Sequence, residues 1–389
     1  MKRSAINKSE QGFTLIELMV ALVAGLIAIS SVYTISKASS QNFHEQQRIS
    51  QAQMATRMAV EQIRLDVQRA GFLGSPNTAT ARTCLPMPDG QHFGAIQVLQ
   101  GADTGSLPNA ATNRVEADRV TMVGNYATTS RYVIASAIGT LARIDGSTQG
   151  FRDSFGIPGT DFDAAIFNDV FRTGRYLHIE DTDGDHFFLR ITSTDPSTLS
   201  VNFTPSLNSG SGNCVSGALR QSFISPLMRV EYAVVDASDG SVNLANIFGD
   251  GPQQILDAQR GTTPSVLIRR EVAFDPAASP IPNSERIVLD FVANFDVDII
   301  ADINGAPGLP PTIVRMDDLA AQALTLNNPQ QVRSVIINVA NRTADQDESF
   351  PFVPRAAGAP LTRYQVNPDR PGAARVRGLR AEIFLPNVL

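Results

Sequence analysis

The chain contains one run of carboxylates at alternate positions, Asp181-Thr182-Asp183-Gly184-Asp185. The first half of a calcium loop has this spacing, so Asp181, Asp183 and Asp185 are candidate calcium ligands. Such a loop needs glycine where this chain has His186, and a bidentate glutamate where it has Thr192. We therefore favour a polar hairpin turn between predicted strands at 175–180 and 186–192, with calcium as the alternative.

The other residue types that carry out catalysis, such as histidine, serine and cysteine, show no spacing that is typical of a catalytic site. The four histidines form no zinc motif, no Gly-x-Ser-x-Gly elbow occurs, and neither cysteine has the local sequence of a nucleophile. His178 and His186 lie on either side of the predicted turn, where they would face each other; a solvated or capped histidine is the favoured interpretation. Lys37 is the only lysine after residue 8, which excludes lysine-dependent chemistry from the rest of the chain. The sequence predicts no enzyme and no cofactor.

A single ionisable side chain, Glu17, stands in an apolar run from Phe13 to Ser36. These 24 residues would span roughly 36 Å as a helix, enough to cross the ~30 Å hydrocarbon core of a bilayer. Lys2, Arg3 and Lys8 favour a cytoplasmic amino end and export of the rest. A carboxylate in a membrane is costly and usually marks a function with a specific partner. The alternative is an interfacial carboxylate favoured by the helix dipole.

Export bears on the two cysteines, Cys84 and Cys214. Outside the cytoplasm they are candidates for one disulfide that closes a long loop. Such a bond would contribute up to roughly 4 to 5 kcal/mol by restricting the unfolded chain. Two unpaired thiols are the alternative.

Helical periodicity continues beyond the apolar run. Apolar side chains recur three or four residues apart at Ala52, Ala55, Ala59, Ile63, Val67 and Ala70, with polar side chains on the opposite face. Gly71, Gly74 and Pro76 end the pattern. We predict one helix over 13–70, with an apolar membrane half at 13–36 and an amphipathic half that needs an apolar surface to pack on.

After Pro76 the pattern changes to short β-like runs separated by turn signals. It predicts a short helix at 317–325 and strands at 118–123, 131–135, 175–180, 186–192, 198–203, 227–235, 266–274, 294–300, 332–339 and 381–385. The expected fold class is α+β, a long N-terminal helix packed on a large antiparallel β-rich head. We divide the head into an elaboration at 71–221 and a C-terminal sheet region at 222–389.

The start of the apolar run, Gly12-Phe13-Thr14-Leu15-Ile16-Glu17-Leu18, resembles the processing site of type IV prepilins and pseudopilins. The resemblance implies that prepilin peptidase cuts between Gly12 and Phe13, releases a leader of residues 1–12 and methylates the new amino terminus at Phe13. It also implies that Glu17 neutralises the terminal amine of a neighbouring subunit in a filament. Three later stretches are similar to PilW-type minor pilins: 69–74, 332–335 and 383–389.

That likeness implies a minor pilin that primes assembly of a type IV pilus and sits at its tip. Its partners would be other minor pilins, the major pilin and a pilus-tip adhesin, with prepilin peptidase as processing enzyme. Before assembly the protein would lie in the inner membrane with a periplasmic head, and afterwards at the extracellular pilus tip. A pseudopilin of a type II secretion system is one alternative.

A second alternative is a tip head that binds a surface or DNA. Removal of residues 1–12 takes away three of the 32 basic and one of the 38 acidic side chains, leaving a formal charge of 29 − 37 = −8. This acidic balance argues against nucleic acid as a partner. The local cluster of Arg375, Arg377 and Arg380 is the one candidate for it, and we favour a solvated strand edge there.

Overall fold

The computed structural model describes residues 14–80, 83–85, 92–207, 219, 221–236, 265–275, 277–304, 310–344, 346–356 and 358–388. The helices are α1 (Leu15–Gln68), α2 (Ala110–Asn113), α3 (Gln149–Phe155), α4 (Ala164–Val170) and α7 (Asp318–Asn327), with short 3-10 turns at Thr104–Ser106 and Pro329–Gln331. The strands are β1 (Ile96–Leu99), β2 (Arg119–Gly124), β3 (Tyr132–Ile138), β4 (Leu141–Ile144), β5 (Tyr176–Glu180), β6 (His186–Asp195), β7 (Ser200–Thr204), β8 (Phe223–Asp236), β9 (Ser265–Val272), β10 (Arg286–Leu289), β11 (Val292–Asp302), β12 (Ile313–Met316), β13 (Val332–Arg342), β14 (Arg363–Tyr364) and β15 (Ala374–Phe384).

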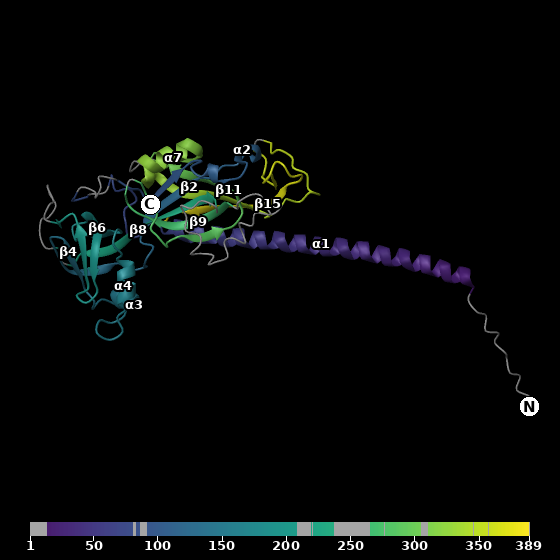
Figure 1. The fold of residues 1–389 in the computed structure, drawn as a ribbon. Helices are drawn as coiled ribbons and strands as arrows, with labels where there is room; N and C mark the ends of the chain where they lie inside the picture. The colour runs from purple at the N-terminus through teal and green to yellow at the C-terminus, as the bar shows by residue number, and fades with distance from the viewer. Residues whose placement is uncertain are drawn as a thin grey trace, which may run out of the picture. The chain divides into compact units, whose positions relative to one another are not determined.

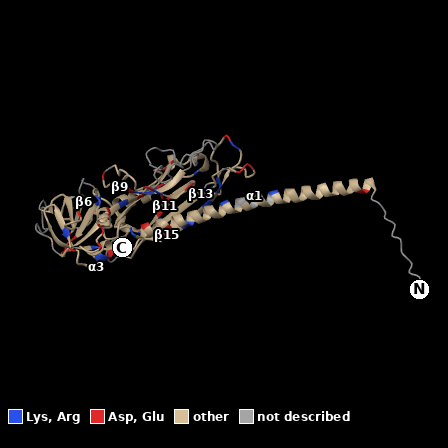
Figure 2. Ribbon diagram, turned by 60° about the horizontal axis from the view of Figure 1, so that its bottom comes forward, with Lys and Arg blue, Asp and Glu red and all other residues tan. Residues whose placement is uncertain are grey.

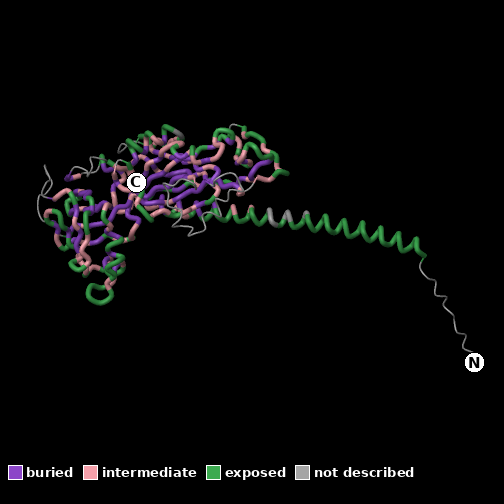
Figure 3. The backbone as a smooth tube through the Cα atoms, in the orientation of Figure 1, coloured by how far each residue is buried: buried purple, intermediate pink, exposed green. Residues whose placement is uncertain are grey.

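The chain forms two compact units, residues 1–51 and 52–389. Most of the first is helical: the residues from Leu15 to Lys37 are exposed, and are apolar and long enough to cross a membrane. Figure 2 shows this part of α1 almost without charged residues, and Figure 3 shows it exposed throughout. The predicted apolar helix is confirmed.

The second unit begins within α1, whose residues from Ala52 on supply one wall of a core. Ala59, Ile63, Val67 and Ala70 are buried as the periodicity predicted. Ala55 is exposed, and Thr56 and Val60 are buried instead. The first part of the buried stripe is therefore rotated around α1 relative to the prediction. Thr56 can be buried because its hydroxyl donates to the Ala52 carbonyl (2.9 Å) and is not left unpaired.

Strand β8 is the centre of the larger sheet, which has ten strands (Figure 1). It pairs with β3 and β5 along its first part and with β2 and β9 along its second. The antiparallel pairings β8–β3–β4–β7–β6–β5–β8 close into a ring. Apolar side chains of this ring and of α3 and α4 form a core of their own, rich in phenylalanine.

A second sheet has the order β12–β11–β13–β15–β14 and is antiparallel throughout. Alternate residues of β11 and β13, such as Phe295, Val297 and Ile337, enter the core that contains the buried face of α1. Residues of β1, β2 and β8 enter the same core. On the other face of β13, Ile336 is only 5% exposed, so this strand is covered on both sides, as its apolar sequence indicated.

The α+β prediction is confirmed, and each of the ten predicted strands overlaps an observed one. The sequence analysis missed the short strands β1, β4, β10, β12 and β14 and the helices α2, α3 and α4. The boundary predicted at 221/222 falls just before β8. Because β8 pairs with strands from both predicted regions, no sheet edge marks that boundary, and it stays a prediction.

A buried ion pair joins α1 to the larger sheet. The Asp66 carboxylate accepts hydrogen bonds from Arg269 Nε (2.5 Å) and Tyr232 Oη (2.7 Å). Tyr126 Oη donates to the Asp66 carbonyl (3.1 Å). Burial, together with the Asp66 charge, raises the pKa of Tyr232, so the phenol stays protonated and donates. The pair fixes the rotation and register of α1 on the sheet.

We predict that Asp66→Ala lowers the free energy of unfolding by about 3 to 5 kcal/mol, because it leaves the Arg269 charge and the Tyr232 hydroxyl without their acceptor. The measurement is denaturant unfolding of the full chain in detergent, followed by near-ultraviolet circular dichroism. Glu61→Ala is the matched control: this α1 carboxylate pairs with Arg64 at the surface, so its loss should cost less than about 1 kcal/mol. Equal stability of the two variants would contradict the role of Asp66.

Candidate functional site

Helix α1 begins with a reciprocal pair of hydrogen bonds between Thr14 and Glu17. The Thr14 backbone N–H donates to Glu17 Oε2 (3.0 Å), and the Glu17 N–H donates to Thr14 Oγ1 (3.3 Å). The Thr14 hydroxyl also donates to Glu17 Oε2 (2.9 Å). This is a capping box, in which two side chains satisfy backbone donors that the first helical turn leaves open. It holds the carboxylate at the first turn.

The capping box was the feature that sequence reasoning missed here. Its signal is present as Thr-x-x-Glu directly before an apolar run. The structure thus gives Glu17 a local role that the resemblance did not imply. A carboxylate engaged with Thr14 still has a negative charge and a second oxygen for a partner.

The helix that follows exposes apolar side chains on all sides. Leu15, Ile16, Leu26 and Ile29 are each at least 60% exposed. Two hydroxyls within the run bond back to the helix itself: Ser31 Oγ donates to the Ile27 carbonyl and Thr34 Oγ1 to the Ser31 carbonyl, both at 2.9 Å. Such a surface requires lipid or other apolar helices around it.

Comparison with known proteins agrees with this part of the chain. Residues 7–33 match the family model for the prokaryotic N-terminal methylation motif. The motif covers the predicted leader junction, Thr14, Glu17 and most of the apolar run, and it indicates a type IV pilin-like or pseudopilin protein. No curated protein and no solved structure matches the chain. Gly12 and Phe13 lie outside the described residues, so cleavage and methylation there stay predictions.

Three stretches that the sequence analysis singled out, 69–74, 332–335 and 383–388, lie together near the end of α1. Asn387 Nδ2 donates to the Gln68 carbonyl (2.7 Å), which caps the helix. At Gly71, φ is +76° and an added Cβ would lie 3.1 Å from the Asn387 carbonyl oxygen, so a side chain is disfavoured. Val335 pairs with Ile383 between β13 and β15. These stretches therefore build one junction between the helix and the second sheet.

Asp181, Asp183 and Asp185 form the hairpin turn between β5 and β6. The Asp181 carboxylate accepts a hydrogen bond from the Asp183 N–H (2.6 Å), and the Asp181 N–H donates to the Asp185 carbonyl (3.0 Å). Gly184 has φ of +77°, as a tight turn requires. Within the described residues no group of three or more metal-ligating side chains is gathered for a metal ion. The predicted hairpin turn is therefore formed, and calcium binding there stays untested.

His178 and His186 face each other across this hairpin. His178 Nδ1 lies 2.8 Å from the Leu73 carbonyl and therefore donates to it, and His178 Nε2 lies 2.9 Å from His186 Nδ1. The rings are stacked with centroids 5.1 Å apart. His178 is buried and has a partner at each ring nitrogen, so of the two favoured interpretations, solvated or capped, it is not solvated. The pair ties the ring of strands to the segment that follows α1.

The remaining candidates are the two cysteines and the arginine cluster of β15. Cys84 is buried and disulfide-bonded, while Cys214 lies outside the described residues, so their pairing stays a prediction. In the arginine cluster, Arg375 pairs with Asp347 (3.1 Å) and Arg380 lies 3.9 Å from Asp298. Carboxylates beside two of the three arginines offset part of the positive charge of this strand.

We predict that the His178 pair makes stability depend on pH. Burial and the neighbouring His186 lower the pKa of His178 from 6.5 to about 4. Between these values the unfolded chain binds a proton that the folded protein does not, so the free energy of unfolding falls as pH drops from 6.5 to 4, by on the order of 3 kcal/mol. Above pH 6.5 this contribution is fully present.

The measurement compares unfolding free energies at pH 7 and pH 4.5 for three proteins. His178→Phe should lose less stability on acidification than the wild type, because Phe keeps the stacking and does not titrate. His92→Gln, a change at an exposed histidine, should match the wild type. Parallel pH profiles for His178→Phe and the wild type would refute the assignment.

Proposed function

We propose that this protein is a minor pilin that primes assembly of a type IV pilus and remains at its tip. The observation that carries the proposal is an exposed apolar helix with a lone carboxylate held in its first turn, within a methylation motif. Its role is structural rather than enzymatic. Prepilin peptidase cuts between Gly12 and Phe13 and methylates Phe13, and other minor pilins, the major pilin and a tip adhesin are its partners.

Assembly proceeds by exchange of lipid for helices around α1. Before assembly the apolar run holds the protein in the inner membrane, with the head in the periplasm. When a partner helix packs alongside, the Glu17 carboxylate meets the partner's terminal amine, and two isolated charges in an apolar setting become a pair. This contact is heterologous and does not close on itself, so it extends into a helical filament.

The size of the head supports a position at the tip. Heads of about 300 residues have a radius of gyration of roughly 19 Å, against about 13 Å for a 100-residue head. Repeating such a head at every helical step would crowd a filament of closely packed helices, whereas a single terminal copy would not. The meeting of the three PilW-like stretches at one junction supports the minor-pilin assignment.

A pseudopilin of a type II secretion system remains the second candidate, because the methylation motif suits both assemblies. Genes beside this one distinguish them: a tip adhesin gene favours the pilus, and secretion-channel genes favour the pseudopilin.

We predict that Gly12→Val blocks removal of the leader, because the bulky side chain stands next to the bond that is cut. Mass spectrometry of the membrane fraction should find the amino terminus at Met1 instead of a methylated Phe13. Gly25→Val is the matched control, since a side chain at Gly25 meets nothing within 4 Å; it should be processed normally. A methylated Phe13 in the Gly12→Val protein would show that the site lies elsewhere.

We predict that the charge of Glu17, and not its cap, is what docking requires. Glu17→Gln retains an oxygen for the Thr14 N–H, because glutamine also completes a capping box, but it has no charge for a partner's amine. It should insert into the membrane and yet reduce pilus number to that of a deletion strain. Thr14→Ala removes the hydroxyl and keeps the charge, so it should retain most pili.

Sheared-pilus immunoblots and electron microscopy give the pilus numbers, and membrane fractionation checks insertion. Normal pilus numbers with Glu17→Gln would defeat the docking role. An equal loss with Thr14→Ala would assign the requirement to the start of the helix instead.

A further inference from the structure

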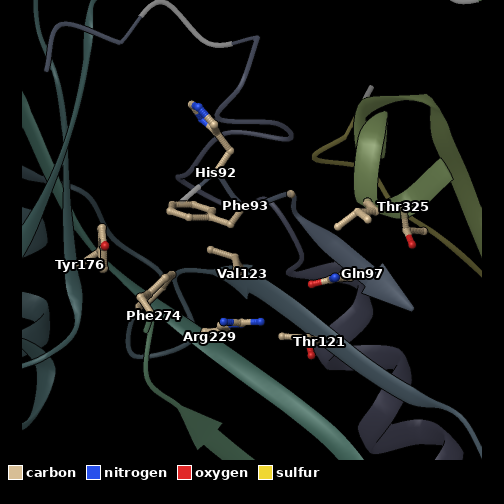
Figure 4. Close-up of a pocket in the computed structure, with 11 residues that line it drawn as sticks. His92, Phe93, Gln97, Thr121, Val123, Tyr176, Arg229, Phe274 and Thr325 are labelled. Atoms are coloured by element: carbon tan, nitrogen blue, oxygen red, sulfur yellow. The ribbon is translucent and has the colours of Figure 1, made fainter. Parts of the chain in front are cut away.

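A cavity of about 420 Å³ lies in the unit of residues 52–389, on the face of β1, β2 and β8 that points away from α1 (Figure 4). Side chains alternate along these strands: Ile96, Met122 and Val230 enter the core with α1, so their neighbours Gln97, Thr121 and Arg229 face the other way. The volume is that of a pocket for a small molecule.

Aromatic rings form one wall of this cavity. Phe93 comes from the segment before β1, Tyr176 from β5, and Phe274 from the residues after β9. The Phe93 ring lies 5.8 Å from Tyr176 and 5.2 Å from Phe274, and the Tyr176 and Phe274 rings are 4.3 Å apart. Three separate elements thus converge on one apolar wall, while Thr325 of α7 lies on the opposite side (Figure 4); Leu326 also lines the cavity.

Arg229 supplies a positive charge to the floor. Figure 4 shows its side chain extending along the floor towards Thr121. In the part of the chain that the structure describes, no hydrogen bond or ion pair joins its guanidinium to another side chain. The adjacent Glu231 is engaged by Arg270 (Nε–Oε1 2.8 Å), and Asp275 accepts from the Ser279 N–H. Burial lowers the pKa of Arg229, because it removes water that would stabilise the charge.

A half-buried guanidinium that opens into a cavity and is hydrogen-bonded to no carboxylate is suited to an anion brought by a ligand. Among the described residues that line the cavity, Arg229 is the one arginine or lysine, and Glu231 and Asp275 are near enough to act on its charge. The local field therefore suits a single negative charge, a carboxylate, better than a phosphate dianion. The aromatic wall suits a flat or ring-shaped body, and Gln97 and Thr121 offer hydrogen bonds to it.

We propose that this cavity binds a small carboxylate that carries a ring, with the carboxylate on Arg229 and the ring against Phe93, Tyr176 and Phe274. An aromatic acid and an acidic sugar share this chemistry. The site lies on the sheet face opposite α1, so it operates independently of filament assembly.

The test is isothermal titration of the full-length protein in nanodiscs, with empty nanodiscs as the blank. The probes are benzoate for an aromatic acid and glucuronate for an acidic sugar. Three comparison compounds test the separate features: acetate has no ring, benzyl alcohol has no charge, and inorganic phosphate carries more negative charge than a carboxylate. We expect saturable binding of benzoate or glucuronate, with the three comparison compounds at least tenfold weaker; the tighter of the two probes identifies the source of the ring.

Arg229→Gln should weaken the better probe at least tenfold, and Arg229→Lys should lie between it and the wild type, because lysine keeps the charge and loses the planar fork. Arg286→Gln is the control, since this exposed arginine lines a different cavity, and it should bind as the wild type does. Thermal melting confirms that each variant is folded. If Arg229→Gln does not fold, the test of the proposal is whether Arg229→Lys loses affinity. Absence of saturable binding by both probes, unchanged affinity in the Arg229 variants, or tighter binding of phosphate would overturn the proposal.

Discussion

One continuous helix has to satisfy two different environments, and the rest of the chain follows from that constraint. From Leu15 to Lys37 the surface of α1 is apolar on every side and needs lipid or other helices around it. From Ala59 on, a stripe that includes Val60, Ile63 and Val67 is buried in the core, while Met58 and Leu65 stay exposed. Apolar contacts alone allow a helix to rotate or slide on its support. Asp66 prevents this, because a buried carboxylate that meets both Arg269 and Tyr232 permits only one register.

Strand β8 allows one chain to build a sheet against α1 and a separate ring of strands. Its first part belongs to the ring and its second part to the sheet, so both share a continuous backbone. Charged pairs reinforce the connection: Arg175, next to β5, holds Glu271 of β9 with two hydrogen bonds of 2.6 and 2.8 Å. Such bidentate contacts give geometric specificity. The ring therefore belongs to the same unit as the helix-bound sheet.

Features that depend on neighbours in sequence were predictable, and features that depend on neighbours in space were not. The apolar run, the ten longest strands and the Asp181 turn follow from hydrophobic period and turn chemistry. Ala55, expected in the core, is exposed, and Thr56 is buried there because its hydroxyl is satisfied by its own helix. The burial of His178 depends on Leu73, and the charge on Asp66 meets Arg269 of β9. No local pattern records contacts of this kind, and the short strands β4 and β14 carry too few residues to show an alternation.

Side chains alternate along β1, β2 and β8, so these strands present one surface to α1 and another to the cavity. Val230 and Tyr232 face α1, and Arg229, the residue before Val230, faces the cavity. A shift of one residue in register would exchange the two sets and place the Arg229 charge against the helix, so the register is strongly specified. Within that register, substitutions at Gln97, Thr121 or Arg229 alter the cavity and leave the helix-packing side chains in place. The sheet face that packs on α1 and the face that lines the cavity can therefore vary independently.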